Sequence, residues 1–437
     1  MTDLPAGWRT LTPHDIADAS RQALVIGPFG SDLKTVDYQP EGVPLVFVRD
    51  IRGGDFSNPR TFVSPEKAEE LKAHHAMPGD VLITKMGNPP GDAAVYNGAG
   101  PAVITADCIR LRPALGFDAR YIAYAMHSPN VKAQISAITS GVAHQKVSLD
   151  RFRHKVKIPV PPFSEQKRIV EVLEEHLSRL DAGVEYLDAA KRRSERFRVA
   201  LNHRLFARYA SFLKPLSSVV VIENGQTPRG ITDRLTDTPT DDVVPFFKVG
   251  DMNSGDGRNM AASRYFVRRV DAGSFGISVR SAGSVLIPKR GGAIATNKKR
   301  ILTTEAAYDL NTMGLRPKEP LSVDYLWRWF QGVDLGRIAD GSSVPQINAK
   351  QVKSLSIPVI CREKQDRLVA ELDDLDGSAN RLLAAVASGQ KQASSLRRAL
   401  FAAAFAGRLT GATSEAEQIE ETAAGAVETK IPEGVQF

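Results

Sequence analysis

Two stretches of the chain, residues 162–207 and 362–407, place apolar or small residues at alternating spacings of four and three. No further proline follows Pro162 in the first stretch, and the second contains none. This heptad-like spacing is typical of long helices with an apolar seam on one face. We expect the seam at Ile169, Leu173, Leu180, Leu187, Phe197, Leu201, Leu368, Leu372, Leu375, Leu382, Leu396 and Leu400.

Each helix would be about 65 Å long if unbroken, at 1.5 Å per residue. A solitary helix of this kind would expose its apolar stripe, so we expect the two helices to pack antiparallel as a coiled coil. Small residues near the middle of both, such as Gly183 and Gly389, would let the backbones approach closely. The alternative is that each helix only covers its own globular domain.

A globular stretch of roughly 150 residues precedes each helix. Residues 43–48 and 80–84 in the first, and 243–249 and 284–288 in the second, are short apolar runs bounded by Gly and Pro, which predicts strands. Tyr121 corresponds to Tyr325 in the second stretch. These correspondences predict two diverged copies of one domain that contains both strands and helices.

The helical stretches are also copies of one another, because residues 158–207 recur without a gap as residues 357–406. Both copies begin Ile-Pro-Val, and Gln166 corresponds to Gln365. Such a repeat indicates two similar domains and two similar ligands. We therefore expect an α+β protein with two similar mixed α/β domains, each with a target of its own to recognise, separated by two long antiparallel helices. The expected segments are a first domain (1–157), a first helix (158–210), a second domain (211–356), a second helix (357–411) and an acidic disordered tail (412–437).

Composition narrows the class of protein. The 437 residues are 42% hydrophobic and 24% charged, and no apolar run approaches the roughly 20 residues that span a bilayer. The first residues lack the pattern of a signal peptide, and Cys108 and Cys361 form no CxxC motif, so we expect a cytoplasmic protein that does not contact membranes. The net charge is +7, and the tail holds six Glu and one Lys, so the body is about +12. This excess favours a polyanionic partner, although charge alone is weak evidence.

Several enzyme classes are disfavoured. All eight histidines lie at or before His203, so an activity shared by both copies uses no histidine, neither in nucleophilic catalysis nor as a metal ligand. The string Asn88-Pro89-Pro90 resembles the motif with which amino-methyltransferases grip an exocyclic amine, but Gly91 follows where that motif has an aromatic residue. No phosphate-binding GxxxxGK[ST] loop occurs, so we expect no ATP hydrolysis by this chain, and the positions of the cysteines and histidines predict no metal site.

Basic and amide side chains near Gly-rich loops remain as candidates for DNA binding. Glycine lets a backbone approach a phosphate, and Lys or Arg can neutralise it or read guanine. The alternative is that these are solvated charged loops. The candidates are Arg49, Arg52, Lys85, Asn88, Gln145, Lys146, Lys248, Arg258, Lys289, Arg290, Lys298, Lys299, Arg300 and Gln346.

Five strings carry a resemblance to a known family: GPFGSDLK (27–34), VPLVFVRDI (43–51), PGDVL (78–82), IPVPPFSEQKRIV (158–170) and LRRALFAAAFAGRLTG (396–411). They resemble the specificity (S) subunit of type I restriction-modification systems. The second copy departs from the pattern, with Ile360, Cys361 and Lys364 in place of Pro161, Pro162 and Glu165. This departure bears on how the second helix begins.

The resemblance implies a non-catalytic subunit that binds double-stranded DNA at a bipartite target, with half-sites about one turn, roughly 34 Å, apart. It implies two modification subunits, which carry S-adenosylmethionine and methylate adenine N6. Two restriction subunits, which use ATP and Mg, can join them, so we expect no cofactor on this chain. The alternatives are a self-sufficient adenine methyltransferase or fused restriction enzyme, and a coiled-coil adaptor with no role in DNA binding.

Overall fold

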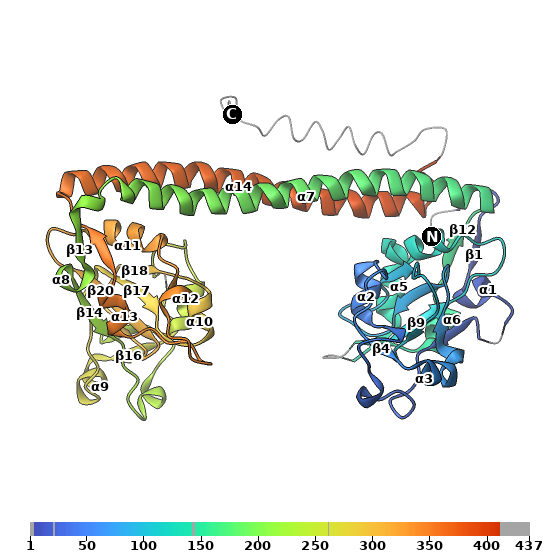
Figure 1. The fold of residues 1–437 in the computed structure, drawn as a ribbon, viewed down its shortest axis with the longest axis horizontal. Helices are drawn as coiled ribbons and strands as arrows, with labels where there is room; N and C mark the ends of the chain where they lie inside the picture. Colours follow the sequence, from blue (N-terminus) through green and yellow to red (C-terminus); the bar gives the residue numbers. More distant parts are fainter. Residues whose placement is uncertain (1–3, 21, 142–144, 261, 411–437) are drawn as a thin grey trace. The chain divides into compact units, whose positions relative to one another are not determined.

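The computed structural model describes residues 4–20, 22–141, 145–260 and 262–410 and divides the chain into two compact units (Figure 1). Unit 1 comprises Met1–Leu187 and Ala387–Phe437, and unit 2 comprises Asp188–Val386. Each unit therefore contains a globular body and parts of two long helices. The acidic tail expected at 412–437 lies outside the described residues.

The body of unit 1 is built on two small four-stranded sheets. Its elements are β1 (Arg9–Leu11), α1 (Pro13–Ile16), β2 (Leu24–Ile26), η1 (Thr35–Asp37), β3 (Val43–Val46), α2 (Val48–Gly53), β4 (Phe62–Val63), α3 (Pro65–Glu70), η2 (Lys72–His74), β5 (His75–Ala76), β6 (Val81–Thr84), β7 (Ala93–Val95), β8 (Ala102–Ile104), β9 (Cys108–Leu111), α4 (Ala119–His127), α5 (Pro129–Ile138), β10 (Thr139–Ser140), β11 (Lys146–Val147), α6 (Leu149–Lys155) and β12 (Ile158–Val160). One sheet is antiparallel in the order β2-β9-β6-β7. The other has the order β4-β3-β8-β5, with β3 and β8 parallel. Two separate pairs, β1-β12 and β10-β11, complete the body.

The body of unit 2 repeats this topology. Its elements are η3 (Ala210–Phe212), β13 (Leu213–Pro215), α8 (Leu216–Val219), β14 (Val220–Asn224), η4 (Ile231–Arg234), β15 (Val243–Phe247), η5 (Val249–Asn253), β16 (Phe266–Arg268), α9 (Arg269–Ser274), β17 (Ser284–Pro288), α10 (Gly292–Ala295), β18 (Arg300–Leu302), β19 (Ala307–Tyr308), β20 (Thr312–Pro317), α11 (Val323–Gln331), α12 (Leu335–Ile338), α13 (Ala349–Lys353) and β21 (Ser356–Pro358). The sheet β14-β20-β17-β18 matches β2-β9-β6-β7, and β16-β15-β19 matches β4-β3-β8. The four predicted strands are present as β3, β6, β15 and β17, and the two bodies share one order of strands.

A glycine stands after the first strand of the antiparallel sheet in both units because no side chain fits there. A Cβ on Gly27 would lie 2.2 Å from the carbonyl carbon of Thr105. A Cβ on Gly225 would lie 2.0 Å from the carbonyl oxygen of Asp309. The first glycine of GPFGSDLK is therefore a requirement of the scaffold, and it recurs for the same reason in the second copy.

The two long helices are α7 (Phe163–Ala207) and α14 (Arg362–Ala404). The residues assigned to their beginnings lie in strands instead: Ile158–Val160 form β12, which pairs with β1, and Ile357 and Pro358 lie in β21, which pairs with β13. Both helices thus begin a few residues after the segments assigned to them. None of the helices within the described residues is both long and apolar enough to cross a lipid bilayer.

A buried glutamine in the first turn ties each long helix to its body. The Gln166 Oε1 accepts a hydrogen bond from the backbone N–H of Asp118 at 2.9 Å, and the Gln365 Oε1 accepts one from Ser322 at 2.9 Å. Asp118 and Ser322 are the N-caps of α4 and α11. The Nε2 of Gln365 donates to the carbonyls of Pro320 and Ile360, at 2.9 and 2.8 Å. Both glutamines are almost completely buried, so their hydrogen bonds are sheltered from water.

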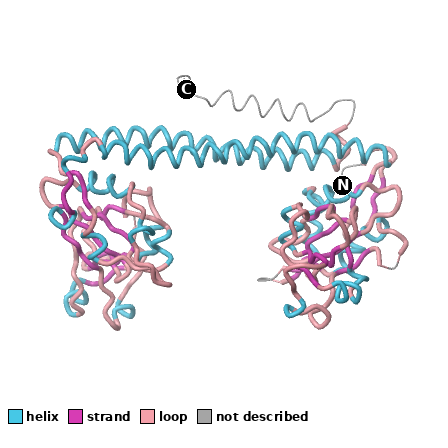
Figure 2. Tube along the Cα trace, viewed as in Figure 1, coloured by secondary structure: helices cyan, strands magenta, loops and turns pink. Residues whose placement is uncertain are grey.

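Each unit joins the beginning of one long helix to the end of the other. In unit 1, Tyr121 of the body packs on Phe405 just beyond α14, with ring centroids 5.1 Å apart. In unit 2, Tyr325 packs on Phe206 of α7, also at 5.1 Å. Figure 2 shows the two helical segments side by side within each unit. The alternative in which each helix covers only its own body is therefore wrong.

The apolar seam is only partly as expected. Ile169, Leu173, Leu368, Leu372 and Leu400 are buried, but they lie in cores shared with the bodies. Within unit 1 the two helices pack tightly at Gly389, where a Cβ would lie 3.0 Å from Leu187 Cδ1. The predicted seam positions Phe197, Leu375 and Leu382 are wrong, since they are 61%, 37% and 47% exposed. A straight helix turns every 3.6 residues, so positions chosen at heptad spacing drift off one face.

Ion pairs join the globular body of unit 2 to the long helix α14. Arg328 of α11, whose side chain is 6% exposed, forms ion pairs with Asp373 and Asp376 of α14. Arg258 bridges Asp373 and Asp324, at 3.2 and 2.7 Å. In unit 1 the position that corresponds to Arg328 is Tyr124, whose ring faces Phe401 at 6.2 Å. Unit 1 has an ion pair of its own between body and helix, Arg120 with Glu174 at 3.1 Å, so the two bodies are fastened by different residues.

We expect Gln365→Ala to destabilise unit 2 by about 2–3 kcal/mol, because it removes the side-chain partner of the buried Ser322 N–H and of the buried Ile360 carbonyl. Urea unfolding followed by tryptophan fluorescence measures this effect, since Trp327 and Trp329 both lie on α11. Gln166→Ala is the matched control, which should leave the transition of these two tryptophans unchanged. An unaltered unfolding midpoint in Gln365→Ala would contradict the anchoring role.

The charge network predicts a pH-dependent stability. Burial by itself raises the pKa of Asp373, but hydrogen bonds and charges from Arg328 and Arg258 outweigh it, so the net pKa is lowered. A carboxyl with a lowered folded-state pKa contributes stability above its unfolded pKa of about 3.9 and loses it as the pH falls further.

We therefore expect Asp373→Asn to cost on the order of 1–2 kcal/mol at pH 7, after allowing for solvent screening. The difference from wild type should shrink below about pH 4. Urea titrations at several pH values test this, with Glu363→Gln, in an exposed pair, as the control. A difference that stays constant down to pH 3 would rule out this linkage.

Candidate nucleic-acid interface

Predicted DNA-binding residues of unit 1 meet where the loop after β6 lies against β11. The backbone N–H of Val147 donates to the carbonyl of Lys85 at 3.0 Å, and that of Gly87 donates to Gln145 at 3.1 Å. Met86 and Lys146 are therefore opposite one another in an antiparallel bridge. We call this two-stranded segment, residues 85–87 with 145–147, ribbon 1.

Unit 2 contains the same arrangement at the equivalent place. The N–H of Ile347 donates to the carbonyl of Lys289 at 2.9 Å, and that of Gly291 donates to Pro345 at 2.8 Å. Arg290 and Gln346 are opposite one another in the bridge. Residues 289–291 with 345–347 form ribbon 2.

A further backbone hydrogen bond fixes each ribbon to the preceding sheet. The N–H of Lys85 donates to Asp107 and that of Lys289 donates to Asn311, both at 2.7 Å. Three equivalent backbone hydrogen bonds thus occur in both ribbons, although the side chains differ. Lys146 and Arg290 are exposed, and Asn88 is exposed just beyond ribbon 1. Each unit presents a basic edge here.

Other candidates in unit 1 are engaged with the protein. Arg52 of α2 donates through Nε to Asp92 at 2.9 Å and through Nη2 to the carbonyl of Pro89 at 3.1 Å. Burial raises the pKa of Asp92, but Lys132 and Arg52 outweigh this and lower it overall. Arg49 is half exposed and lies over the ring of Phe47 at 4.2 Å. Arg52 therefore supports the loop beside ribbon 1, and Arg49 keeps access to solvent.

Lys248 and Lys298 in unit 2 are not part of ribbon 2 and have partners of their own. The Nζ of Lys248 is 3.9 Å from the ring centroid of Tyr265. The Nζ of Lys298 donates to the side-chain oxygen of Asn253. Both remain partly exposed.

The geometry argues against DNA contacts by three predicted residues. Lys299 is 2% exposed, and its Nζ donates to Asn297 and to the carbonyl of Val333, at 2.8 and 2.7 Å. Burial lowers the pKa of Lys299 to about 8, and Asp334 partly offsets this. Arg300 is buried and donates to the carbonyl of Met252 at 2.7 Å. Arg258 is held by Asp324 and Asp373 through the ion pairs described above. A run of basic residues therefore includes structural cations that sequence alone could not separate from exposed ones.

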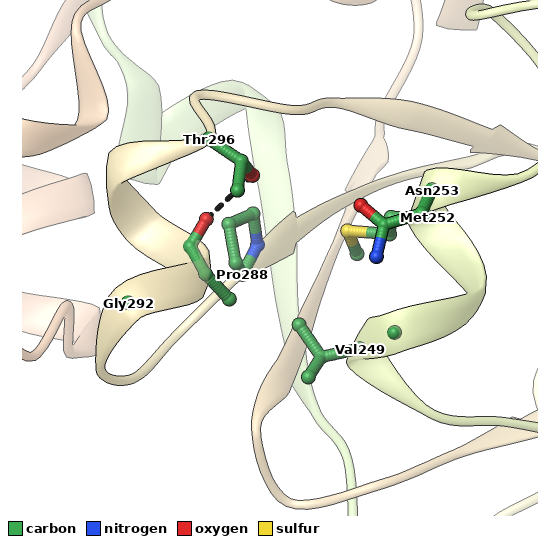
Figure 3. Close-up of a pocket in the computed structure, with 8 residues that line it drawn as sticks. Val249, Met252, Asn253, Pro288, Gly292 and Thr296 are labelled. Atoms are coloured by element: carbon green, nitrogen blue, oxygen red, sulfur yellow. Dashed lines mark hydrogen bonds between the residues drawn. The ribbon is translucent and has the colours of Figure 1, made fainter. Parts of the chain in front are cut away.

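A cavity of about 280 Å³ lies beside ribbon 2 (Figure 3). Its walls come from η5 and from α10 with the residues that flank it. The hydroxyl of Thr296 donates to the carbonyl of Ala293 at 2.7 Å and is thereby fixed on one wall. Residue 253 takes the place on η5 that Arg52 has on α2. Because the side chain of Asn253 is shorter than that of an arginine, it leaves a cavity beside residues 289–291 of ribbon 2. The lining residues are Val249, Gly250, Met252, Asn253, Pro288, Gly292, Ala293 and Thr296.

Met86 belongs to ribbon 1 but was not among the predicted residues. The sequence contained a signal for it, since Val147 is an apolar residue within a polar loop and marks the inward face of a short strand. Its neighbour Lys146 must then face outward, and the residue opposite Lys146 must share that face. Only the bridge itself identifies that residue as Met86.

Residues 54–185, which include ribbon 1 and the beginning of α7, match the family model of the type I restriction modification DNA specificity domain. A chain from a structure on complex assembly and conformational transition of the type I R-M system is similar in fold, with a TM-score of 0.71 and 19% identity over 92% of this chain and 98% of that chain. The HsdS subunit from Thermoanaerobacter tengcongensis gives a TM-score of 0.51 and 18% identity over the same shares. At these identities the likeness shows a shared fold, with two mixed domains joined by long helices.

Proposed function

We propose that this chain, which carries the DNA specificity domain of type I restriction-modification systems and shares the fold of an S subunit, recognises a bipartite target in double-stranded DNA. Each unit reads one half of the target. The observation that carries this proposal is the repetition of one basic ribbon in both units, with the same backbone hydrogen bonds and different side chains.

A two-stranded ribbon is narrow enough to enter the major groove, and exposed basic side chains on it can contact phosphates or base edges. Lys146 and Arg290 supply such a charge in units 1 and 2, and Arg49 adds one on α2 of unit 1. The glycines beside the bridged residues, Gly87 and Gly291, are both partly exposed. Two ribbons with different side chains suit a target whose two halves differ in sequence.

The chain supplies recognition, and partner subunits supply catalysis. In this proposal two modification subunits carry S-adenosylmethionine and methylate adenine N6 at the target. Two restriction subunits that use ATP and Mg join them where cleavage occurs. Support comes from the specificity-domain match, whose family is generally non-catalytic.

The alternative of a self-sufficient methyltransferase is less compatible with the loop that first suggested it. A Cβ on Gly91 would lie 2.7 Å from Ile135 Cδ1, and the φ of Gly91 is 93°. The position therefore does not accommodate the aromatic residue that would stack on an extruded adenine. Transfer of label from S-adenosylmethionine by the purified chain alone would restore this alternative.

We expect Lys146→Glu combined with Arg290→Glu to weaken binding of the full chain to duplex DNA by roughly 100-fold at physiological salt, because each reversal replaces an attraction to the duplex with a repulsion. The slope of log K against log salt should become shallower, because the loss of two cations from the interface reduces the release of counterions from the duplex. Fluorescence anisotropy with a labelled duplex at several salt concentrations measures both quantities.

Lys72→Glu combined with Arg269→Glu is the matched control. It makes the same change in net charge at exposed residues that lie away from the ribbons. The control should bind much as the wild type does. Equal losses in the two double variants would mean that overall charge, and not the ribbons, governs binding.

A further inference from the structure

We infer that the outward-facing pair of side chains on each ribbon determines which bases are read, with Arg290 and Gln346 reading neighbouring base pairs for unit 2, and Met86 and Lys146 doing so for unit 1. This assignment rests on the proposed function and deepens it. It separates base reading from the general attraction between basic loops and DNA.

The alternation of residues along each ribbon fixes which side chains face outward. Ile347 and Val147 are 0% and 2% exposed, so their side chains belong to the core. Successive residues of a strand point to opposite faces, and their neighbours Gln346 and Lys146 therefore point away from it. Residues directly opposite in an antiparallel pair share a face, which places Arg290 beside Gln346 and Met86 beside Lys146.

The spacing within a pair suits neighbouring base pairs. Opposite residues of an antiparallel pair have Cβ atoms about 4.5–5.5 Å apart. Successive base pairs are about 3.4 Å apart along the duplex. Two side chains so placed, one of them as long as arginine or lysine, can reach adjacent base edges without any change in the backbone.

The four side chains are free to do so. Within the described residues, none of the four makes a side-chain hydrogen bond or ion pair. Arg52 and Arg258, in contrast, are held by carboxylates. The backbone of ribbon 2 is further fixed by Asp340, whose Oδ1 accepts from the N–H of Gln346 at 2.8 Å and whose own N–H donates to the carbonyl of Gln346 at 2.9 Å. A rigid backbone with unengaged side chains is what selective reading requires.

The chemistry of each pair indicates the bases. Arginine binds O6 and N7 of guanine with two hydrogen bonds, and glutamine does the same with N6 and N7 of adenine. The half-target of unit 2 should therefore contain a guanine next to an adenine, on either strand. In unit 1, Lys146 suits guanine and the apolar Met86 suits the methyl group of thymine. The two half-targets then differ because the same backbone carries different side chains.

Methylome sequencing tests the assignment in a host that expresses the full chain with its modification subunit. We expect Arg290→Ala and Gln346→Ala each to relax one position in the same half of the methylated motif, and the two positions to be adjacent. Discrimination against the wrong base should fall about 10- to 100-fold at each. Lys146→Ala should relax a position in the other half. Arg269→Ala, at an exposed arginine of unit 2 away from ribbon 2, should leave the motif unchanged.

Two results would overturn the inference. One is an unchanged motif in Arg290→Ala and Gln346→Ala while the wild-type chain directs methylation to a defined motif. The other is loss of methylation in Arg290→Ala together with an unrelaxed motif in Arg290→Gln, which would indicate a phosphate contact, because glutamine can still hydrogen-bond a phosphate but does not select guanine. If the wild-type chain directed no methylation to any bipartite motif, the proposed function itself would fail, so the two failures are distinguishable.

Discussion

The structure depends on a buried amide that joins each long helix to its globular body. Gln166 and Gln365 satisfy the backbone of the residue that caps α4 or α11, and so link two helix beginnings through one side chain. Buried polar groups of the backbone are costly to leave unpaired, and a glutamine can accept and donate at once. The direction in which each helix leaves its body is thereby fixed from its first turn.

The other end of each helix is held by a different type of contact. Phe206 and Phe405 pack on Tyr325 and Tyr121 with almost the same ring separation. Every unit is therefore closed by a polar anchor and an aromatic pair, and both recur. What does not recur is the charge network around Arg328, which fastens only unit 2 in this way among the described residues. The repeat preserved the contacts that define the fold and allowed the remaining ones to diverge.

The sequence predicted the architecture better than it predicted the interface. The repeated residues 158–207 and the strands at 80–84 and 284–288 were reliable because buried apolar periodicity reflects the core, and the resemblance drawn from the same strings agrees with the matches found. The basic run 298–300 misled, because burial of Lys299 depends on contacts with a carbonyl at residue 333 that no local pattern shows. Met86 was missed for a related reason, since its bridge partner lies sixty residues away.

The central claim is that two copies of one backbone ribbon address two different halves of one DNA target. Site-specific photo-crosslinking tests it most directly, with a benzophenone amino acid placed at residue 146 or at residue 290 of the full chain bound to its target with the modification subunits. The account predicts that crosslinks from residue 146 fall in one half of the target and crosslinks from residue 290 fall in the other. Crosslinks from both residues in the same half, or from neither within the target, would contradict it.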